Sequence, residues 1–253
     1  SIIAKAGDIA LDSCKFGSYD IPTVNVNTSG TIKGKLEVTG GELQIEKGAF
    51  TDLANAVKYA NDGAIIKLAE NTEGAGIFLA KGEKEITIDF NEKTYTVNSA
   101  VGSTGTASQA MHLEKGNKVL LKNGTITSDG QEDGNVKMLV QNYSDLTLED
   151  MNLDGRQLIG AGTGRYVLSN NSGTVNINGN TSITAKDGDI ALDSCKFGNY
   201  DIPTVNVNTT GTIKGKLEVT GGELEIVNGA FTDLANAVEY AAEQASIKLA
   251  ENT

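Results

Sequence analysis

The first 72 residues of this chain occur twice. Residues 1–72 return as residues 182–253 at a constant offset of 181, without insertion or deletion, and 60 of the 72 aligned positions are identical. A repeat constrains the fold more than a local motif does, because repeated units bury their apolar faces by stacking on neighbouring copies. We therefore expect the chain to be one full period of 181 residues plus the start of the next, as in a window cut from a longer tandem array.

The composition favours β-structure with many turns and excludes two classes of partner. The chain has 30 Gly, 2 Pro and no Trp, and it is rich in Thr, Asn, Val and Ile, which suit strands and turns. Its formal net charge is −12, so nucleic acid and anionic membrane surfaces are poor partners. No apolar run approaches the ~18 residues of a membrane-spanning helix, so we expect no membrane insertion.

The cysteine and histidine counts predict neither a disulfide framework nor a zinc site. Cys14 and Cys195 occupy equivalent positions of the two copies, which is one Cys per period, and we expect both to be buried as small apolar side chains. His112 is the single His, so four soft zinc ligands cannot be assembled. It lies in a strand-like run with no nucleophile motif nearby, and we expect it to pack at a surface or turn. No cofactor is expected.

Short strands are predicted through the repeated opening and beyond it. Apolar residues alternate with a period of two, between Gly- and Ser-containing turn signals, in the pairs Ile9/Leu11, Val24/Val26, Leu36/Val38, Leu43/Ile45, Ile66/Leu68 and Ile77/Leu79. Such alternation places one face of each strand in a core.

The period changes to that of a helix after Phe50. Thr51 is suited to the N-cap, and apolar residues then recur at helical spacing up to Ala60, so a helix over 51–60 is predicted. Gly63 is suited to ending it. The second copy predicts a helix over 232–244, slightly longer because Ala-Glu-Gln replaces Asn-Asp-Gly.

Three segments share one template of charged, apolar, variable, apolar and charged residues: 85–89, 118–122 and 145–149. Aligning them places Ile86, Val119 and Leu146 in one inward row and Ile88, Leu121 and Leu148 in another. Outside, Glu85, Lys118 and Asp145 form one charged column, and Asp89, Lys122 and Glu149 form a second. Signs alternate in both columns, so opposite charges would help to fix the register. The pairs Val175/Ile177 and Val205/Val207 continue the rows, at spacings of roughly thirty residues that suit successive turns of a parallel sheet.

Segments such as VLLKNGTIT and LTLEDMNLDG resemble right-handed parallel β-helix proteins, the pectate-lyase-like superfamily in the broad sense. The stretch GGELQIEKGAFTDLANAVKYANDGAIIKLAENT is similar to the opening of β-helix modules in large secreted bacterial surface proteins. The resemblance implies an all-β fold, a right-handed parallel β-helix with short α-helices capping or interrupting it at module junctions. It also implies a location outside the cell, at a bacterial surface.

On that interpretation the chain has three parts. Residues 1–46 are the last coils of a preceding module, residues 47–228 are a complete module that opens with the helix 51–60, and residues 229–253 begin the next. Leu53, Val57 and Ala60 would then cover the open end of the coil. The alternative is a continuous coil with the helix bulging sideways, and the sequence does not separate the two.

Enzymes have this fold, but the sequence contains no motif that identifies a catalytic site. Lyases of the superfamily combine acidic calcium ligands with a basic residue, and the chain offers one acidic patch, Asp145, Glu149, Asp150 and Asp154, and two arginines, Arg156 and Arg165. The loop 128–135 reads as an exposed excursion, or as a calcium site using Asp129, Glu132 and Asp133, although its spacing does not match an EF-hand.

We expect a non-enzymatic protein: a structural or adhesive module that acts as a stiff stalk or multivalent scaffold, with neighbouring modules joined head to tail. The alternatives are a polysaccharide lyase and a glycan-binding surface, with a glycan or a host-cell ligand as partner. Aromatic residues are 5% of the chain, too few for an obvious sugar platform, and Tyr19 and Tyr200 are the best exposed candidates. Threonine and asparagine rows (Thr174, Asn176, Asn178; Thr204, Asn206, Asn208) could bind sugar hydroxyls, but outward strand positions and an Asn ladder explain them.

Overall fold

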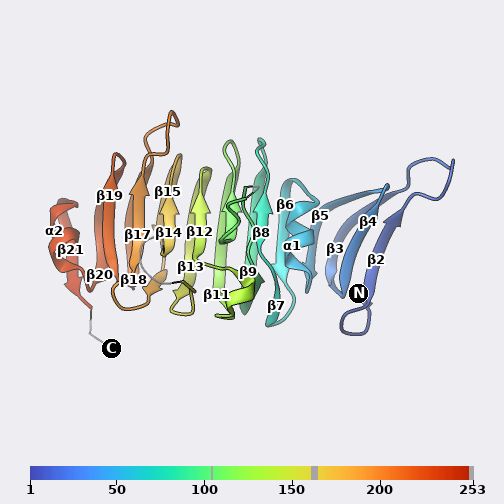
Figure 1. Cartoon of the computed structure of the whole chain (residues 1–253), viewed down its shortest axis with the longest axis horizontal. Coiled ribbons are helices and arrows are strands. Elements are labelled where there is room, and N and C mark those ends of the chain that lie inside the picture. Colours follow the sequence, from blue (N-terminus) through green and yellow to red (C-terminus); the bar gives the residue numbers. More distant parts are fainter. Residues whose placement is uncertain (104, 161–164, 251–253) are drawn as a thin grey trace.

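The computed structural model describes residues 1–103, 105–160 and 165–250, and these form an elongated all-β molecule. Its strands lie side by side along the long axis (Figure 1), and every strand pair is parallel. The antiparallel pairings among the described residues are isolated bridges such as Val101 with Gln109. The predicted parallel arrangement is therefore confirmed, and hairpin returns are not used.

The strands form a large sheet of thirteen, a smaller sheet of six and a pair. The large sheet contains β1 (Ile2–Ile3), β3 (Thr23–Lys33), β5 (Glu42–Phe50), β6 (Ala60–Leu68), β7 (Thr72–Ala75), β9 (Glu85–Ser99), β11 (Lys118–Ser128), β13 (Asp145–Gly155), β15 (Thr174–Asn178), β16 (Ser182–Ala185), β18 (Thr204–Lys214), β20 (Glu223–Phe231) and β21 (Ala241–Leu249). The six-stranded sheet contains β8 (Ile77–Leu79), β10 (Gln109–Leu113), β12 (Met138–Asn142), β14 (Tyr166–Asn170), β17 (Ile190–Cys195) and β19 (Lys216–Thr220), and the pair is β2 (Ile9–Cys14) with β4 (Lys35–Thr39).

From β9 to β20 the chain passes repeatedly between the large and the six-stranded sheet. Parallel neighbours cannot be joined by a tight turn, so each return to the large sheet needs a crossover. Here a strand of the opposite sheet serves as that crossover: β10 follows β9, β12 follows β11, and β14 follows β13. The apolar side chains that face inward between the sheets form one continuous core.

The register predicted from the shared template is confirmed at every position of the inward rows. Val119 pairs with Ile86 on one side and with Leu146 on the other, and Leu121 pairs in the same way with Ile88 and Leu148. Val175, Ile177, Val205 and Val207 continue these rows. All of these side chains are at most 3% exposed, so the rows are the central part of the core.

The charged columns lie in register, but the expected ion pairs do not form. Lys118 pairs across the sheet with Glu85 and Asp145, yet neither Lys118 nor Lys122 makes an ion pair among the described residues. Asp89 is buried rather than outward, because it accepts hydrogen bonds from the backbone of Asn91 and the side chain of Asn123. The register therefore rests on the apolar rows.

The predicted helix exists but is shorter than expected. α1 covers Leu53–Lys58, and its N-cap is Asp52 rather than Thr51. Asp52 accepts a hydrogen bond from the backbone N–H of Asn55, whereas the Thr51 hydroxyl accepts one from the backbone of Gly34. Gly63 does not end the helix, because the chain already enters β6 at Ala60. Residues 61–64 form an irregularity in that strand, where the register with β5 shifts.

The second helix is not longer than the first. α2 covers Leu234–Glu239, the positions equivalent to α1, and β21 begins at Ala241. The pairing of Ala241 with Ile226 repeats the pairing of Ala60 with Ile45. The strand ladder therefore ends the helix, and the better helix formers that replace Asn-Asp-Gly do not extend it.

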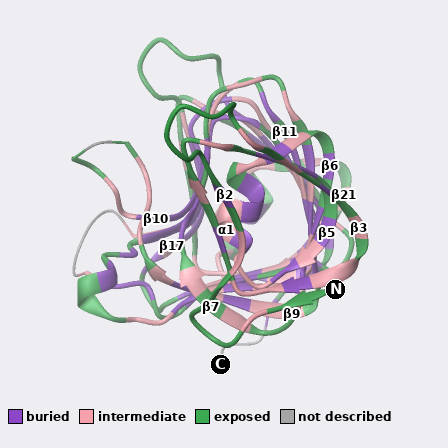
Figure 2. Ribbon diagram, turned by 90° about the vertical axis from the view of Figure 1, so that its right-hand side faces the viewer, coloured by how far each residue is buried: buried purple, intermediate pink, exposed green. Residues whose placement is uncertain are grey.

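The helix α1 interrupts the smaller sheet and leaves the large sheet continuous. It contacts β4 on one side and β8 on the other, while β5 and β6, the strands before and after it, pair directly in the large sheet. Leu53, Ala56 and Val57 are fully buried, and α1 lies inside the ring of strands when viewed along the long axis (Figure 2). The helix therefore neither covers an open end nor bulges sideways.

The two copies have the same strands in different surroundings. Ile183 is fully buried between β13 and β18, whereas its counterpart Ile2, in the first strand, is 43% exposed. At the other end Leu53 is fully buried under the following strands, and its counterpart Leu234 is 36% exposed. Burial thus depends on whether a neighbouring coil is present. No helix within the described ranges is long and apolar enough to cross a membrane.

Candidate functional site

Five ring side chains form a row on the outer side of the six-stranded sheet: Phe78, His112, Tyr143, Phe197 and Tyr200. The Phe78 and His112 rings stack with centroids 5.3 Å apart, and His112 lies 5.6 Å from Tyr143. The Tyr143 ring centroid lies 5.5 Å from that of Tyr200 and 6.1 Å from that of Phe197, with the Tyr143 and Phe197 rings in a T-shaped arrangement. We call this set the aromatic row.

Strand register and one loop bring these rings together. His112 pairs with Phe78 of β8 and with Gln141 of β12, so these outward residues are neighbours across the sheet. Tyr143 directly follows β12, and Phe197 and Tyr200 come from the loop after β17. Lys115 fixes that loop: its ammonium lies 2.5 Å from the Asp201 carboxylate and 5.7 Å from the centre of the Tyr200 ring.

Burial is uneven along the aromatic row. His112 and Tyr143 are 3% and 7% exposed, whereas Phe78, Phe197 and Tyr200 are 37%, 56% and 36% exposed. The row therefore has a buried centre and exposed rings at its ends. The same loop in the first copy has no such neighbours, and Phe16 and Tyr19 are correspondingly 79% and 73% exposed.

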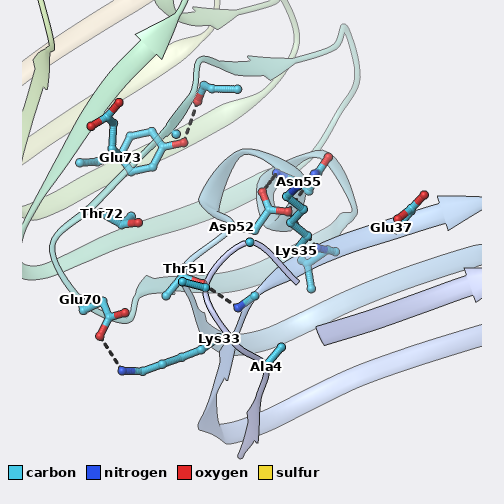
Figure 3. Close-up of a pocket in the computed structure, with 17 residues that line it drawn as sticks. Ala4, Lys33, Lys35, Glu37, Thr51, Asp52, Asn55, Glu70, Thr72 and Glu73 are labelled. Carbon is cyan, nitrogen blue, oxygen red and sulfur yellow. Dashed lines mark hydrogen bonds and ion pairs between the residues drawn. The ribbon is translucent and has the colours of Figure 1, made fainter. Parts of the chain in front are cut away.

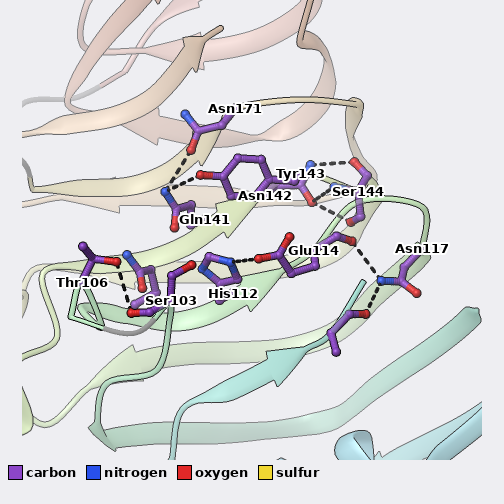
Figure 4. A network of polar contacts seen from close by, with 12 residues as sticks. Ser103, Thr106, His112, Glu114, Asn117, Gln141, Asn142, Tyr143, Ser144 and Asn171 are labelled. Atoms are coloured by element: carbon purple, nitrogen blue, oxygen red, sulfur yellow. Dashed lines mark hydrogen bonds and ion pairs between the residues drawn. The ribbon is translucent and has the colours of Figure 1, made fainter. Parts of the chain in front are cut away.

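A polar network lies beside the buried rings (Figure 4). His112 Nε2 is 2.8 Å from Glu114 Oε1, and the Gln141 amide donates to the Tyr143 hydroxyl and to Asn171 Oδ1, both at 3.1 Å. Burial, followed by the nearby Glu114 carboxylate, raises the pKa of Tyr143 to about 12. The hydroxyl therefore keeps its proton at neutral pH and can donate it.

Next to the aromatic row is an open recess of about 750 Å³, lined by Lys81, Gly82, Glu83, Lys115, Gly116, Asn199 and Tyr200. Its volume falls within the range of about 300–1,000 Å³ typical of small-molecule sites. One wall is the Tyr200 ring, so the recess and the row are continuous. We call it the row recess.

The outward positions of the six-stranded sheet continue as a polar column. Gln141 pairs with Ser169, Ser169 with Asp193, and Asp193 with Glu218. The Ser169 hydroxyl donates to Asp193 Oδ2 at 2.7 Å. The pKa of Asp193 is raised to about 6: burial is the main cause, the hydrogen bond from Ser169 opposes the shift, and the nearby Glu218 carboxylate adds to it.

A second recess, of about 660 Å³, lies beside the start of α1 (Figure 3). Lys33, Lys35, Thr51, Asp52 and Tyr95 are among its lining residues. Three of its polar groups are engaged within the fold: the Lys33 ammonium lies 2.5 Å from Glu70, the Asp52 carboxylate accepts the backbone N–H of Leu36 at 2.9 Å, and the Tyr95 hydroxyl donates to the Ala75 carbonyl at 2.7 Å. Burial, with the Asp52 charge nearby, raises the pKa of Tyr95.

The repeat gives the recess beside α1 a counterpart beside α2. That recess, of about 840 Å³, is lined by the equivalent residues Lys214, Lys216, Thr232 and Asp233, with Arg156 added from the preceding coil. Thr232 and Asp233 make the same bonds to the backbones of Gly215 and Leu217 as Thr51 and Asp52 make to Gly34 and Leu36. Both recesses are therefore structural features of the helix junction.

The acidic patch and the two arginines do not form one site. Arg156 makes a two-point pair with Asp154, at 2.8 and 2.7 Å, and Arg165 lies 2.5 Å from Asp189. The pairing with Arg156 lowers the pKa of Asp154. Asp145 and Asp150 accept backbone N–H groups of the next coil, from Thr174 and Asn180. The two cations are thus neutralised separately.

The loop 128–135 does not assemble the expected ligand set. It contains a 3₁₀ turn, Glu132–Gly134, and Asp129 accepts a hydrogen bond from the backbone of Gln131. The middle of the loop, residues 131–133, is exposed as predicted, whereas Ser128 and Gly134 are buried. Within the described ranges no group of three or more His, Cys, Asp or Glu residues is placed to hold a metal ion.

The expectations for the two cysteines and for His112 are wrong, and the expectation for the Thr and Asn rows is confirmed. Cys14 is exposed and Cys195 half-buried, because the neighbouring Ser13 and Ser194 take the inward positions. His112 is buried at the centre of the aromatic row rather than packed at a turn. Aromatic residues do gather in one place, despite their low number. The Thr and Asn rows are strand ladders as expected: Thr174 pairs with Thr204, and the Asn206 amide donates to Asn176.

One feature of the sequence indicates the aromatic row, although the low aromatic content does not. Phe78 and His112 are the variable middle residues of short apolar strands, and both sit where period-two alternation points outward. Placing Tyr143 and Tyr200 beside them requires the register of the six-stranded sheet, which spans more than 100 residues of sequence.

The comparisons with known proteins return no match: no family model, no curated protein and no solved structure is similar to this chain at the threshold applied.

Proposed function

We propose that this chain is part of a right-handed parallel β-helix built from 181-residue modules, and that its function is mechanical: a stiff stalk or scaffold on a bacterial surface. The right hand is the expected one, because crossovers between parallel strands of one sheet are right-handed in about 98% of cases. The proposal also takes up the resemblance to secreted surface proteins, which implies a location outside the cell.

The observation that carries the proposal is the continuity of the large sheet across the repeat. β21 pairs with β20 in the same register as β6 with β5, so the second copy joins the large sheet in the same way as the first. Within the described residues the large sheet has no break between the copies, since β16, β18 and β20 follow β13 and β15 in one sheet. A sheet that continues unbroken through a junction favours a stiff connection over a flexible one.

Exposed apolar residues of α2 and β21 support stacking on a further module. Leu234, Val238 and Leu249 are 36%, 60% and 68% exposed, whereas their counterparts Leu53, Val57 and Leu68 are fully buried by the strands that follow them. A further module joined head to tail would bury the exposed set in the same way. The proposed partner of this end is therefore another copy of the same module.

The test is the length of arrays with different numbers of periods. From β6 to its counterpart β21 the large sheet advances by seven strand positions, which at about 4.8 Å each is about 34 Å per period. Proteins with one, two and three periods should form rods whose length in electron micrographs grows by that amount. Small-angle X-ray scattering of the same samples would contradict the proposal if the radius of gyration grew as for jointed beads.

A further inference from the structure

We propose that the aromatic row, with the row recess, is a binding site for a neutral oligosaccharide. The site goes beyond the proposed mechanical function, because a stiff array needs no ligand and would persist if the site did not exist. It would give each module one sugar-binding position.

The exposed rings offer the apolar half of such a site. Phe78, Tyr200 and Phe197 stand at the ends of the row, partly exposed, on a support of buried rings. The stacking of Phe78 on His112 and the packing of Tyr200 on Tyr143 hold their positions, so binding would not have to order them. Rigid aromatic faces pack well against the C–H faces of sugar rings, which have an apolar side and a polar rim.

Spare hydrogen-bonding groups offer the polar half. The Tyr143 hydroxyl accepts from Gln141, but its own proton is donated to no group among the described residues. The Gln141 side-chain oxygen likewise accepts no hydrogen bond from any described residue, since both bonds of this side chain use its nitrogen. A donor and an acceptor side by side, next to exposed rings, match a ligand with neighbouring hydroxyl groups.

The charges select a neutral ligand over an acidic one. The Lys115 ammonium is already paired with Asp201, and the row recess carries one further charge of each sign, Lys81 and Glu83. The whole chain has a net charge of −12, which repels polyanions. A protein partner is less favoured, because the exposed rings are interleaved with amides and ion pairs rather than joined in a broad apolar patch.

The repeat supplies the matched control. Tyr19 and Tyr200 occupy equivalent positions in nearly identical loops, KFGSYDIP and KFGNYDIP, but only Tyr200 packs on Tyr143 beside Lys115. A ligand that needs the assembled row will depend on Tyr200 and not on Tyr19. A ligand that simply contacts exposed tyrosines will depend on both.

The experiment is saturation-transfer NMR of the whole chain with neutral hexasaccharides of glucose and xylose in several linkages, with hexagalacturonate as an acidic probe. At least one neutral probe should bind. Tyr200→Ala and Phe78→Ala should each weaken binding by about tenfold or more, as loss of a stacked ring predicts, and Tyr19→Ala should leave it unchanged. Thermal unfolding and circular dichroism of each variant check that the fold is kept.

Four outcomes would overturn the proposal. These are no binding of any neutral probe, binding of hexagalacturonate alone, equal losses in Tyr19→Ala and Tyr200→Ala, and sedimentation showing that Tyr200→Ala abolishes self-association instead, which would make the row a protein interface. None of them bears on the rod-length test, so failure of the site and failure of the stalk are distinguishable.

Discussion

At the scale of single residues, Asp193 makes the stability of the fold dependent on pH. Its carboxyl is 4% exposed, and its pKa is raised from 3.8 to about 6. An acid with a higher pKa in the folded state binds more protons there than in the unfolded chain, so its contribution to stability falls as pH rises from about 4 to about 6. We expect Asp193→Asn to remove this loss, which is at most about 3 kcal/mol.

The measurement is the urea midpoint of the wild type and Asp193→Asn at pH 4 and pH 7.5. The variant should gain stability relative to the wild type at the higher pH only. Asp12→Asn is the control, because Asp12 is the exposed counterpart in the first copy. An equal difference at both pH values would show that the Asp193 carboxyl is not destabilised by burial.

A second residue-scale prediction concerns the cap of α1. Asp52 accepts bonds from the backbone N–H groups of Leu36 and Asn55, so it joins the helix to β4. Asp52→Ala leaves the Leu36 N–H without its partner and removes the cap, which should cost about 1–3 kcal/mol. Thr51→Ala removes only the hydrogen bond from the Gly34 backbone, so comparing the two variants distinguishes loss of the cap from loss of the adjacent bond. Loss of less stability in Asp52→Ala than in Thr51→Ala would contradict the assignment of the cap.

At the scale of elements, the same helix occurs in two environments. Leu53 of α1 is fully buried, and Leu234 of α2 is 36% exposed. Leu53→Ala should cost about 2–5 kcal/mol, as for large-to-small changes in a core, and Leu234→Ala clearly less. Chemical denaturation of the two variants gives the comparison. Equal losses would mean that the strands after α1 do not supply its burial.

Strands with strict apolar alternation were predictable from sequence, whereas β12, β14 and the helix ends were not. The inward rows follow from a period of two within each strand, and matching rows fixed the register of β9, β11 and β13 in advance. Helix propensity, in contrast, extends the second helix past Ala241, but the pairing of Ala241 with β20 competes for the same backbone and prevails. Local preference is weaker than a ladder that a neighbouring strand already defines.

At the scale of the whole molecule, the stacking order of the coils could be predicted from sequence, but the side chains that contact one another on their outer side could not. The aromatic row joins Phe78 and Tyr200, which are far apart in sequence and belong to one row only through the six-stranded sheet and the loop after β17. The charged columns failed as ion pairs for two local reasons. Lys118 and Glu85 lie side by side, but long exposed side chains gain little by pairing. Asp89 is buried and is engaged by Asn123 and Lys67 instead of Lys122.

The last prediction concerns the open edge of the large sheet. β6 is paired on both sides, with β5 and β9, whereas its counterpart β21 is paired only with β20. Amides of β21 should therefore exchange with solvent much faster than those of β6. Joining residues 73–103 of the first period after Thr253 supplies a copy of β9, which should pair with residues 246–248 as β9 pairs with residues 65–67.

Hydrogen exchange followed by mass spectrometry would then show slower exchange of β21, with β11 unchanged as the internal reference. Joining the same 31 residues in scrambled order is the control, since it adds chain without the apolar rows. Unchanged exchange of β21 in the protein with the ordered extension would mean that the added copy of β9 does not pair with β21 as β9 pairs with β6. Because the register of β21 on β20 already repeats that of β6 on β5, we expect protection to extend by one coil for each coil added.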